Sequence, residues 1–207
     1  MKIQEVRDVL YRELSPLLPG WKLVKKEQGF ARGISGGRQV VGVAIWDRNP
    51  EFKFSLVFCT RLDAAEALVH RVSGAQVEHQ KESMTVMTQL EYFFPGERNK
   101  RIRVVTPDEV VAAVAALAPL LRDRALPLLD GMQTISALDR ALNGDDPRLD
   151  TSDPTQRALH ALAVAHLAHN PQFDQILARI EREMSGFLDS LKQQVAQLVA
   201  EIRKEPP

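Results

Sequence analysis

Cysteine, aromatic residues and net charge are scarce in this sequence of 207 residues. The single cysteine, Cys59, lies in an apolar run, so neither an internal disulfide nor a cysteine-rich zinc cluster can form. Formal net charge is zero and aromatic residues make up 6%, which gives no indication of nucleic-acid binding. Because no apolar run is long enough for a signal peptide or a membrane span, we expect a soluble, cytoplasmic protein.

The remaining composition is that of an ordinary folded protein, with 44% hydrophobic and 26% charged residues. The charges are unevenly distributed along the chain. Residues 1–105 hold 17 Lys and Arg against 12 Asp and Glu, whereas residues 106–207 hold 10 against 15. Such a split indicates either that the two halves attract each other or that each half faces a different partner.

The first half of the chain predicts an antiparallel sheet packed by helices. Apolar residues recur at helical spacing over residues 2–18, and the segments that follow alternate apolar and polar residues, which is typical of strands. The expected fold class is therefore α+β, with a sheet of about five strands and a helical second half. The expected strands are Trp21–Phe30, Val40–Trp46, Phe52–Thr60, and a second hairpin of Met84–Phe94 with Arg101–Val105.

Several short motifs predict helix starts. Thr106–Glu109 combines a threonine N-cap, a proline in the first turn and a glutamate three residues on. Asp63–Glu66 has the same capping-box spacing, and Thr134–Leu142 predicts a further short helix. Pro119 and Pro127 are expected to kink or divide the helical segment that begins after Thr106.

The polar, acidic segment 144–154 contains two prolines and is the expected linker. It divides the chain into a predicted α+β sheet domain, residues 1–143, and a helical hairpin or assembly region, residues 155–207. Asn170 is placed to cap the helix that follows Pro171.

The last thirty residues predict one long amphipathic helix. From Phe173 to Ile202 there is no proline and one glycine, Gly186, which predicts a helix of about 45 Å. Its apolar stripe either packs within the chain as a helix bundle or forms a two-chain coiled coil. Because the stripe exceeds what short neighbouring helices can cover, self-association into a homo-oligomer is the hypothesis. The stripe has heptad-like spacing with one stutter and consists of Leu177, Ile180, Met184, Phe187, Leu191, Val195, Leu198 and Ile202.

Basic residues gather on the two expected hairpins and would form one basic sheet face if those strands are neighbours. This pattern favours an acidic protein partner, or the chain's own acidic half, over nucleic acid, because aromatic residues are sparse and Glu91 and Glu97 dilute the charge. The candidate partner-binding residues are Lys22, Lys26, Arg98, Lys100, Arg101 and Arg103.

One spacing favours metal-dependent chemistry. Glu51 and Lys53 have the Glu-x-Lys spacing that metal-dependent nucleases place on a strand, and Asp47 is a candidate for the acid that such a site also needs. Alternating charges that face solvent beside alternating phenylalanines explain the same spacing more simply.

Other catalytic patterns are missing from the sequence. His166 and His169 can share one helix face, but His160 points away from them, so the three do not converge on a metal. Ser83 and Cys59 have no base nearby in sequence. We therefore predict no catalytic residue, no metal and no cofactor, with a site assembled from distant residues as the alternative.

The order of elements over residues 1–143 resembles small, functionally uncharacterised bacterial α+β domains. The resemblance rests on Leu14–Leu18 followed by Trp21, on Phe30–Arg32, on the strands VVGVAIW and FKFSLVF, and on Leu126–Leu129. It implies a sheet-and-helix binding domain, some relatives of which accompany toxin or defence genes. It supplies no site residues.

The sequence thus favours a non-enzymatic protein-protein interaction protein that neutralises or scaffolds a partner. The alternatives are a metal-dependent hydrolase or nuclease and a nucleic-acid-binding protein that uses the basic face of the sheet. A membrane is not expected as a partner.

Overall fold

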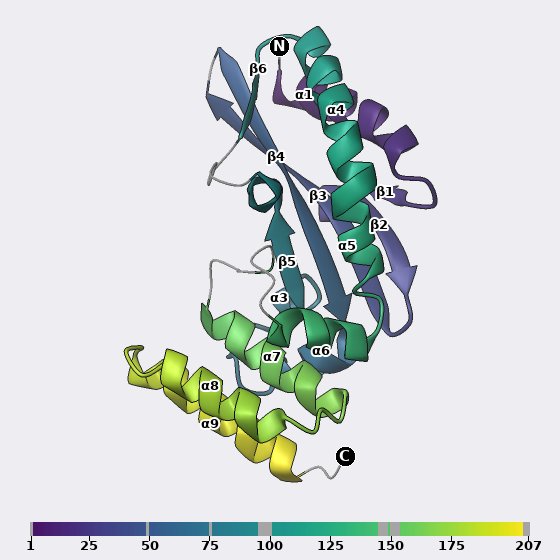
Figure 1. The fold of residues 1–207 in the computed structure, drawn as a ribbon. Coiled ribbons are helices and arrows are strands. Elements are labelled where there is room, and N and C mark those ends of the chain that lie inside the picture. The colour runs from purple at the N-terminus through teal and green to yellow at the C-terminus, as the bar shows by residue number, and fades with distance from the viewer. Residues whose placement is uncertain are drawn as a thin grey trace. The chain divides into compact units, whose positions relative to one another are not determined.

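The computed structural model describes residues 2–48, 50–74, 76–94, 101–144, 149 and 154–204 (Figure 1). The chain divides into two compact units. Unit 1 comprises residues 1–34, 38–59 and 87–131, and unit 2 comprises residues 35–37, 60–86 and 132–207. Each unit is built from separate stretches of sequence, and neither coincides with residues 1–143. Most of the expected linker, residues 145–148 and 150–153, lies outside the described residues.

The strands form one six-stranded sheet, and the expected α+β class with an antiparallel sheet is confirmed. The strand order is β1-β2-β3-β4-β5, and β6 pairs with β4. The strands are β1 (Lys22–Val24), β2 (Gly29–Ile34), β3 (Gly37–Arg48), β4 (Glu51–Leu62), β5 (Val86–Gln89) and β6 (Ile102–Val104).

The second expected hairpin is wrong. β6 pairs antiparallel with β4, where Phe52 lies opposite Val104 and Phe54 opposite Ile102. β5 ends at Gln89, and the apolar run that follows forms a 3-10 turn, Leu90–Phe93, instead of a longer strand. The turn has a packing reason, because the buried ring of Phe93 meets Phe58 edge-on at 5.4 Å between ring centroids.

The expected strand over Trp21–Phe30 is interrupted near its end. Gln28 adopts the left-handed conformation, with φ of 49°, and ends a short 3-10 turn between β1 and β2. The next residue has to be glycine, because a Cβ atom on Gly29 would lie 2.1 Å from the carbonyl oxygen of Val41. The interruption allows β1 and β2 to pair, with Leu23 opposite Phe30.

Two helices of unit 1, α1 (Ile3–Leu14) and α4 (Pro107–Leu120), pack against each other. The expected start of α4 is confirmed. Thr106 Oγ1 accepts a hydrogen bond from the backbone N–H of Glu109, at 3.3 Å. The Glu109 carboxylate in turn accepts one from the backbone N–H of Val105, at 2.7 Å. The first bond satisfies a donor that the first helical turn leaves open, and the second holds the residue just before the N-cap.

The two prolines divide the helical segment as expected. Pro119 lies in the last turn of α4, and the chain then forms a π-helical turn, Leu121–Ala125, before α5 (Leu126–Asp130). Pro127 is the second residue of α5, where its missing N–H removes no essential bond.

In unit 2, α7 contacts four other helices (Figure 1). Its residues Ala158–Ala165 are all buried, and the alternating alanines allow close approach on every side. The expected helix after Thr134 is confirmed, since Thr134 Oγ1 accepts from the N–H of Ala137. The helices of unit 2 are α2 (Asp63–His70), α3 (Val77–Gln80), α6 (Ile135–Asn143), α7 (Pro154–Leu167), α8 (Phe173–Glu183) and α9 (Asp189–Lys204).

α7 ends in a Schellman turn. The N–H of Asn170 bonds the carbonyl of Ala165, and the N–H of His169 bonds the carbonyl of His166, both at 2.9 Å. His169 occupies the left-handed position that glycine usually fills, with φ of 51°. His169 is therefore an exposed residue of the turn that ends α7.

Replacing His169 with glycine is expected to stabilise the protein by about 0.5–1 kcal/mol, because glycine adopts the left-handed conformation without the steric cost of a Cβ atom. Urea unfolding followed by circular dichroism measures the change. Alanine at the same position keeps the strain and serves as the control. Equal stability of the two variants would show that the turn is not strained.

The prediction of one continuous helix over residues 173–202 is corrected by the structure. α8 ends at Glu183, the chain turns through residues 184–188, and α9 begins at Asp189. Ser185 and Gly186 favour the break because both are poor helix formers. An ion pair of 3.6 Å between Asp174 in α8 and Arg203 in α9 shows that the two helices run antiparallel. Among the described residues, none of the helices combines the length and apolarity needed to cross a bilayer.

Candidate functional site

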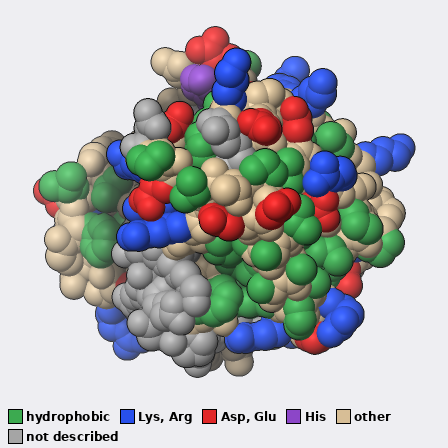
Figure 2. All heavy atoms as spheres, turned by 90° about the horizontal axis from the view of Figure 1, so that it is seen from above, with side chains coloured by type: hydrophobic (Ala, Val, Ile, Leu, Met, Phe, Trp, Pro, Cys, Tyr) green, Lys and Arg blue, Asp and Glu red, His purple; other side chains and the backbone are tan. Residues whose placement is uncertain are grey.

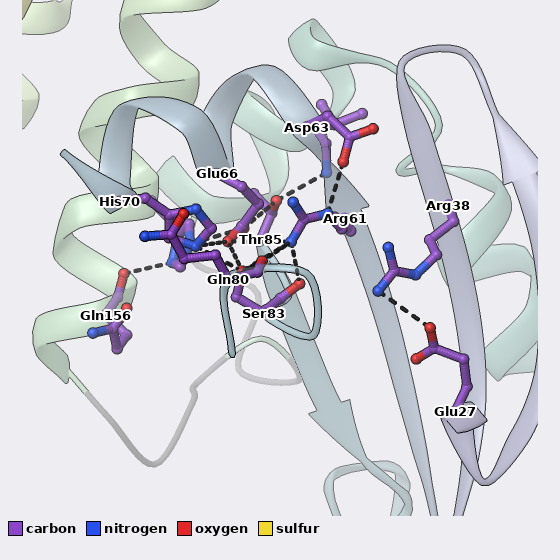
Figure 3. A network of polar contacts seen from close by, with 12 residues as sticks. Glu27, Arg38, Arg61, Asp63, Glu66, His70, Gln80, Ser83, Thr85 and Gln156 are labelled. Carbon is purple, nitrogen blue, oxygen red and sulfur yellow. Dashed lines mark hydrogen bonds and ion pairs between the residues drawn. The ribbon is translucent and has the colours of Figure 1, made fainter. Parts of the chain in front are cut away.

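The most concentrated polar chemistry in unit 2 surrounds Glu66 (Figure 3). Glu66 lies on the buried face of α2, and its side chain is 0% exposed. Its carboxylate accepts hydrogen bonds from the hydroxyls of Ser83, at 2.5 Å, and Thr85, at 2.7 Å. The capping box expected at Asp63–Glu66 is therefore wrong. The N-cap residue is Leu62, without a side-chain cap, and Glu66 points into the core because it has partners there.

Three cationic or titratable groups face the same carboxylate. His160 Nε2 lies 3.0 Å from Glu66 Oε1, without the geometry of a hydrogen bond. His70 Nε2 lies 3.4 Å and Arg61 Nη1 3.9 Å from Oε2. His160 is buried in α7, and its Nδ1 lies 2.8 Å from the carbonyl oxygen of Gln156, one turn earlier in the same helix.

Arg61 connects this carboxylate to the neighbouring loop. Its Nε donates to Asp63 Oδ1 at 2.7 Å, and its Nη1 donates at 2.8 Å to the carbonyl oxygens of Gln80 and Ser83. The hydroxyl of Ser83 accepts a further bond from the same nitrogen, at 2.8 Å. The guanidinium thus fixes the loop that carries Ser83 against α2.

These contacts determine how the groups ionise. Burial alone would raise the pKa of Glu66, but the contact with His160 and the hydrogen bonds from Ser83 and Thr85 outweigh it and lower that pKa to about 2. Burial lowers the pKa of His70 below its ordinary value, against the opposing attraction of Glu66. At neutral pH the centre of the network is therefore a carboxylate.

Ser83, His70 and Glu66 have the residue types of a hydrolytic triad but not its geometry. In a triad the serine and the acid contact opposite nitrogens of the imidazole ring. Here Ser83 Oγ, at 2.8 Å, and Glu66 Oε2, at 3.4 Å, both face Nε2 of His70. Ser83 also donates directly to Glu66, whose low pKa makes it a poor base. The arrangement stabilises unit 2 and does not activate the serine.

The structure does not bring the expected basic residues together. Lys22 lies on β1 and Lys26 in the 3-10 turn after it, whereas Arg103 lies on β6, which pairs with β4. Strands β2, β3 and β4 lie between Lys22 and Arg103 in the sheet order. Arg101 stacks over the ring of Trp46, at 4.2 Å from its centroid. Arg98 and Lys100 lie outside the described residues.

The face seen in the space-filling view carries charges of both signs. In Figure 2, acidic side chains lie among the basic side chains on the face in view. The described part of this face therefore mixes both signs of charge.

The Glu-x-Lys pair forms an internal contact. Lys53 Nζ lies 3.5 Å from Glu51 Oε1 on the same strand. Within the described ranges, no group of three His, Cys, Asp or Glu residues is placed to hold a metal ion. The structure thus provides no support for a hydrolase or nuclease centred on these residues.

The apolar stripe of the last two helices is covered within the chain. α8 and α9 both contact α7. Phe187 and Leu191 are half-buried. Self-association stays a prediction, but an uncovered stripe no longer supports it. The buried residues of the stripe are Leu177, Ile180, Met184, Val195, Leu198 and Ile202.

Each unit has a hollow that is a candidate binding site. Unit 2 also has a hollow of about 460 Å³ beside the Glu66 network, and its lining includes Arg61, Asp63, His70 and Arg71. The α1–β1 groove of unit 1 has a volume of about 380 Å³ and is lined by Arg7, Asp8, Tyr11, Leu23, Lys25 and Gln28. The α6–α8 pocket of unit 2 has a volume of about 450 Å³, and its lining includes Arg140, Asn143, Asn170, Gln172, Arg179 and Arg182. Apart from Lys22 and Lys26, which flank Leu23 and Lys25, sequence reasoning missed both sites, because each gathers residues from separate elements.

Comparison with known proteins adds no assignment: no protein-family model, no curated protein and no solved structure matches this chain. The toxin- or defence-related role implied by the resemblance over residues 1–143 stays a prediction.

Proposed function

We propose that this protein is a non-enzymatic protein-binding protein whose α1–β1 groove takes an extended, acidic segment of a partner protein. The observation that carries the proposal is the position of β1. It is the terminal strand in the sheet order. Leu23, within the strand, and Lys25, just after its end, line a groove. An added strand can pair with a terminal strand and place its side chains in such a groove.

The groove offers an apolar contact as well as a backbone edge. Leu23 is 45% exposed, although it lies within a strand. Tyr11 lines the groove from α1 and is held in place by an edge-on contact with Phe30, with 5.8 Å between ring centroids. A partner side chain that covers Leu23 would remove apolar surface from water, which favours binding.

Charge selects the kind of partner. Arg7 and Lys25 line the groove, and the one acidic residue of the lining, Asp8, already accepts a hydrogen bond from Gln4 at 2.8 Å. Lys22 lies on the same strand as Leu23 and is exposed. The excess of positive charge favours an acidic segment. The proposal keeps the expected acidic protein partner. It assigns Lys22, but not Arg103, to the surface that binds the partner.

A cytoplasmic location fits the proposal. Cys59 is buried, and burial raises the pKa of its thiol to about 12, so it remains a protonated, unreactive thiol.

Selection of 12-residue peptides from a random display library on the full-length protein tests the proposal. Enriched peptides are expected to carry acidic residues and alternating apolar residues. Replacing Leu23 with serine, or Lys25 with glutamate, is expected to weaken their binding about tenfold, equivalent to about 1.4 kcal/mol of lost apolar or charge contact. Isothermal titration calorimetry measures the affinities.

Two matched variants serve as controls. Val105 is also 45% exposed in unit 1 but lies outside the groove, so Val105→Ser should leave binding unchanged. Arg48→Glu reverses an exposed charge outside the groove lining in the same way. Peptides that bind all four variants equally, or a selection that enriches no acidic peptide, would contradict the proposal.

A further inference from the structure

We infer that the α6–α8 pocket of unit 2 binds the phosphate group of a small polar phosphate monoester. This site is separate from the peptide groove proposed for unit 1 and does not depend on it. The inference rests on three arginines that line one hollow, on a half-buried amide network around the buried Asp139 that fixes one of them, and on the lack of partners for the other two in the described part of the chain.

The charge of the lining fits a dianion. Arg140, Arg179 and Arg182 face the hollow together with one acidic residue, Asp139. With one charge per ionised group, the lining carries a net charge of +2. Glu183, outside the lining and 67% exposed, forms a long ion pair of 3.9 Å with Arg179. A phosphate monoester carries a charge of about −1.5 to −2 at neutral pH.

Asp139 does not compete for the arginines because its oxygens are already used. It is only 6% exposed, Oδ1 accepts a hydrogen bond from Asn143 Nδ2 at 2.8 Å, and Oδ2 accepts one from Asn170 Nδ2 at 2.7 Å. The Schellman turn at the end of α7 places Asn170 for this contact. The aspartate therefore orients the two amides that line the hollow.

The amide network in turn holds Arg179. Asn143 donates to the carbonyl of Ala161 at 3.1 Å, which fixes its side chain between α6 and α7. Arg179 donates from Nη1 to the backbone carbonyl of Asn143 at 3.1 Å, and from Nη2 to its side-chain oxygen at 3.2 Å. A guanidinium positioned in this way loses little conformational freedom when an anion binds.

Arg140 and Arg182 are available for a ligand. Both are exposed, and neither forms an ion pair or a side-chain hydrogen bond with the described part of the chain. They come from different helices, α6 and α8, and reach the hollow from separate positions. Arg140 and Arg182 therefore add unpaired positive charge to the hollow that Arg179 also lines, and this charge attracts an anion.

Phosphate suits this lining better than carboxylate does. Three guanidinium groups offer more N–H donors than two carboxylate oxygens can accept, whereas a phosphate monoester presents three terminal oxygens. The neutral side chains of Gln172 and Gln175 line the same hollow and can bond hydroxyl groups of the ligand. The volume of about 450 Å³ is in the range of small-molecule sites.

Titration calorimetry on the full-length protein tests the inference, with glycerol 3-phosphate, inorganic phosphate, succinate and acetate as probes at equal ionic strength. Glycerol 3-phosphate is expected to bind saturably and at least about tenfold more tightly than acetate. Arg140→Ala and Arg182→Ala are each expected to weaken it about fivefold or more. Because both side chains are exposed, unpaired and on helices, alanine should leave the fold intact.

The control is Arg203→Ala, which removes an exposed arginine from the same unit outside the hollow and should change the affinity less than about twofold. Arg182→Lys keeps the charge but loses the planar fork, and it should fall between wild type and alanine. Succinate that binds more tightly than glycerol 3-phosphate would overturn the assignment to phosphate. Binding that is absent, or equal in wild type and both alanine variants, would overturn the site.

Discussion

Replacing Glu66 with alanine is expected to lower the free energy of unfolding of unit 2 by about 3–5 kcal/mol, the usual cost of removing one partner of a buried ion pair. The variant leaves His160 and Arg61 without their carboxylate and the hydroxyls of Ser83 and Thr85 without their acceptor. Urea unfolding followed by circular dichroism at 222 nm measures the loss, because most helices belong to unit 2.

Glu66→Gln separates charge from shape. The amide keeps the volume and one acceptor oxygen, so we expect a smaller loss than for alanine. The matched control is Glu183→Ala, which removes a side chain that is 67% exposed and should change stability by less than about 0.5 kcal/mol. A loss of under 1 kcal/mol for Glu66→Ala would show that the network contributes little to stability.

A second probe tests whether the effect is confined to unit 2. Trp21 and Trp46 both belong to unit 1, so tryptophan fluorescence reports on that unit. If the units unfold independently, the fluorescence transition of Glu66→Ala should remain at the wild-type urea concentration while the circular dichroism transition moves. Coincident transitions in both probes would show that the units unfold together.

The elements that the sequence predicted correctly depend on local interactions. The start of α4 follows from Thr106 and Glu109, which are three residues apart. Thr106 Oγ1 accepts from the N–H of Glu109, and the Glu109 carboxylate accepts from the N–H of Val105. The β3–β4 meander follows from the period-two alternation of Phe52, Phe54, Leu56 and Phe58, which are all buried, although residues 59–62 of β4 are buried as well. Such signals survive folding because no distant residue competes for the same groups.

The errors arise where a distant residue offers a better partner. Glu66 has capping-box spacing from Asp63, yet its carboxylate meets Ser83, Thr85 and His160, which are 17 to 94 residues away. The local sequence around a capping-box glutamate can be the same as that around a buried glutamate. A single sequence therefore cannot separate them.

The break between α8 and α9 has a local signal in the sequence. Ser185 and Gly186 lie together, and the i-to-i−3 hydrogen bond from Ser185 N–H to Arg182 tightens the turn there. The regular apolar spacing over the same residues predicts one continuous helix. Two antiparallel helices that both pack on α7 have the same apolar spacing, so the spacing alone does not distinguish the two arrangements. The candidate pocket of unit 2 was hidden by distance, since Arg140 and Arg182 are 42 residues apart.

Acidification is expected to destabilise unit 2 in two steps, with the larger step below pH 4.5. The fold lowers the pKa of Glu66 from its ordinary 4.5 to about 2, so between these values the unfolded chain takes up a proton that the folded chain does not. The stability contributed by the ionised carboxylate is complete above pH 4.5 and is lost as the pH falls towards 2. A shift of this size corresponds to about 3 kcal/mol in total.

His70 gives the earlier step. Its pKa is lowered from the ordinary 6.5 in the fold, where Arg61 and His160 add to the effect of burial and Glu66 opposes it. The unfolded state therefore binds the proton first, and stability begins to fall as the pH drops below 6.5. Both steps have the same sign, so the protein should be most stable at neutral pH or above.

Urea unfolding at pH 7.5, 5.5, 4.5 and 3 resolves the two steps. Glu66→Gln carries no titrating group at this position and is expected to lose the step below pH 4.5, so its stability approaches that of the wild type as the pH falls. His70→Gln is expected to lose the step that begins at 6.5 and to keep the lower one. Apart from the substituted residue, the unfolded states of these variants titrate alike. If the free energies of unfolding of the wild type and of Glu66→Gln fall in parallel below pH 4.5, the fold does not hold the Glu66 carboxylate ionised.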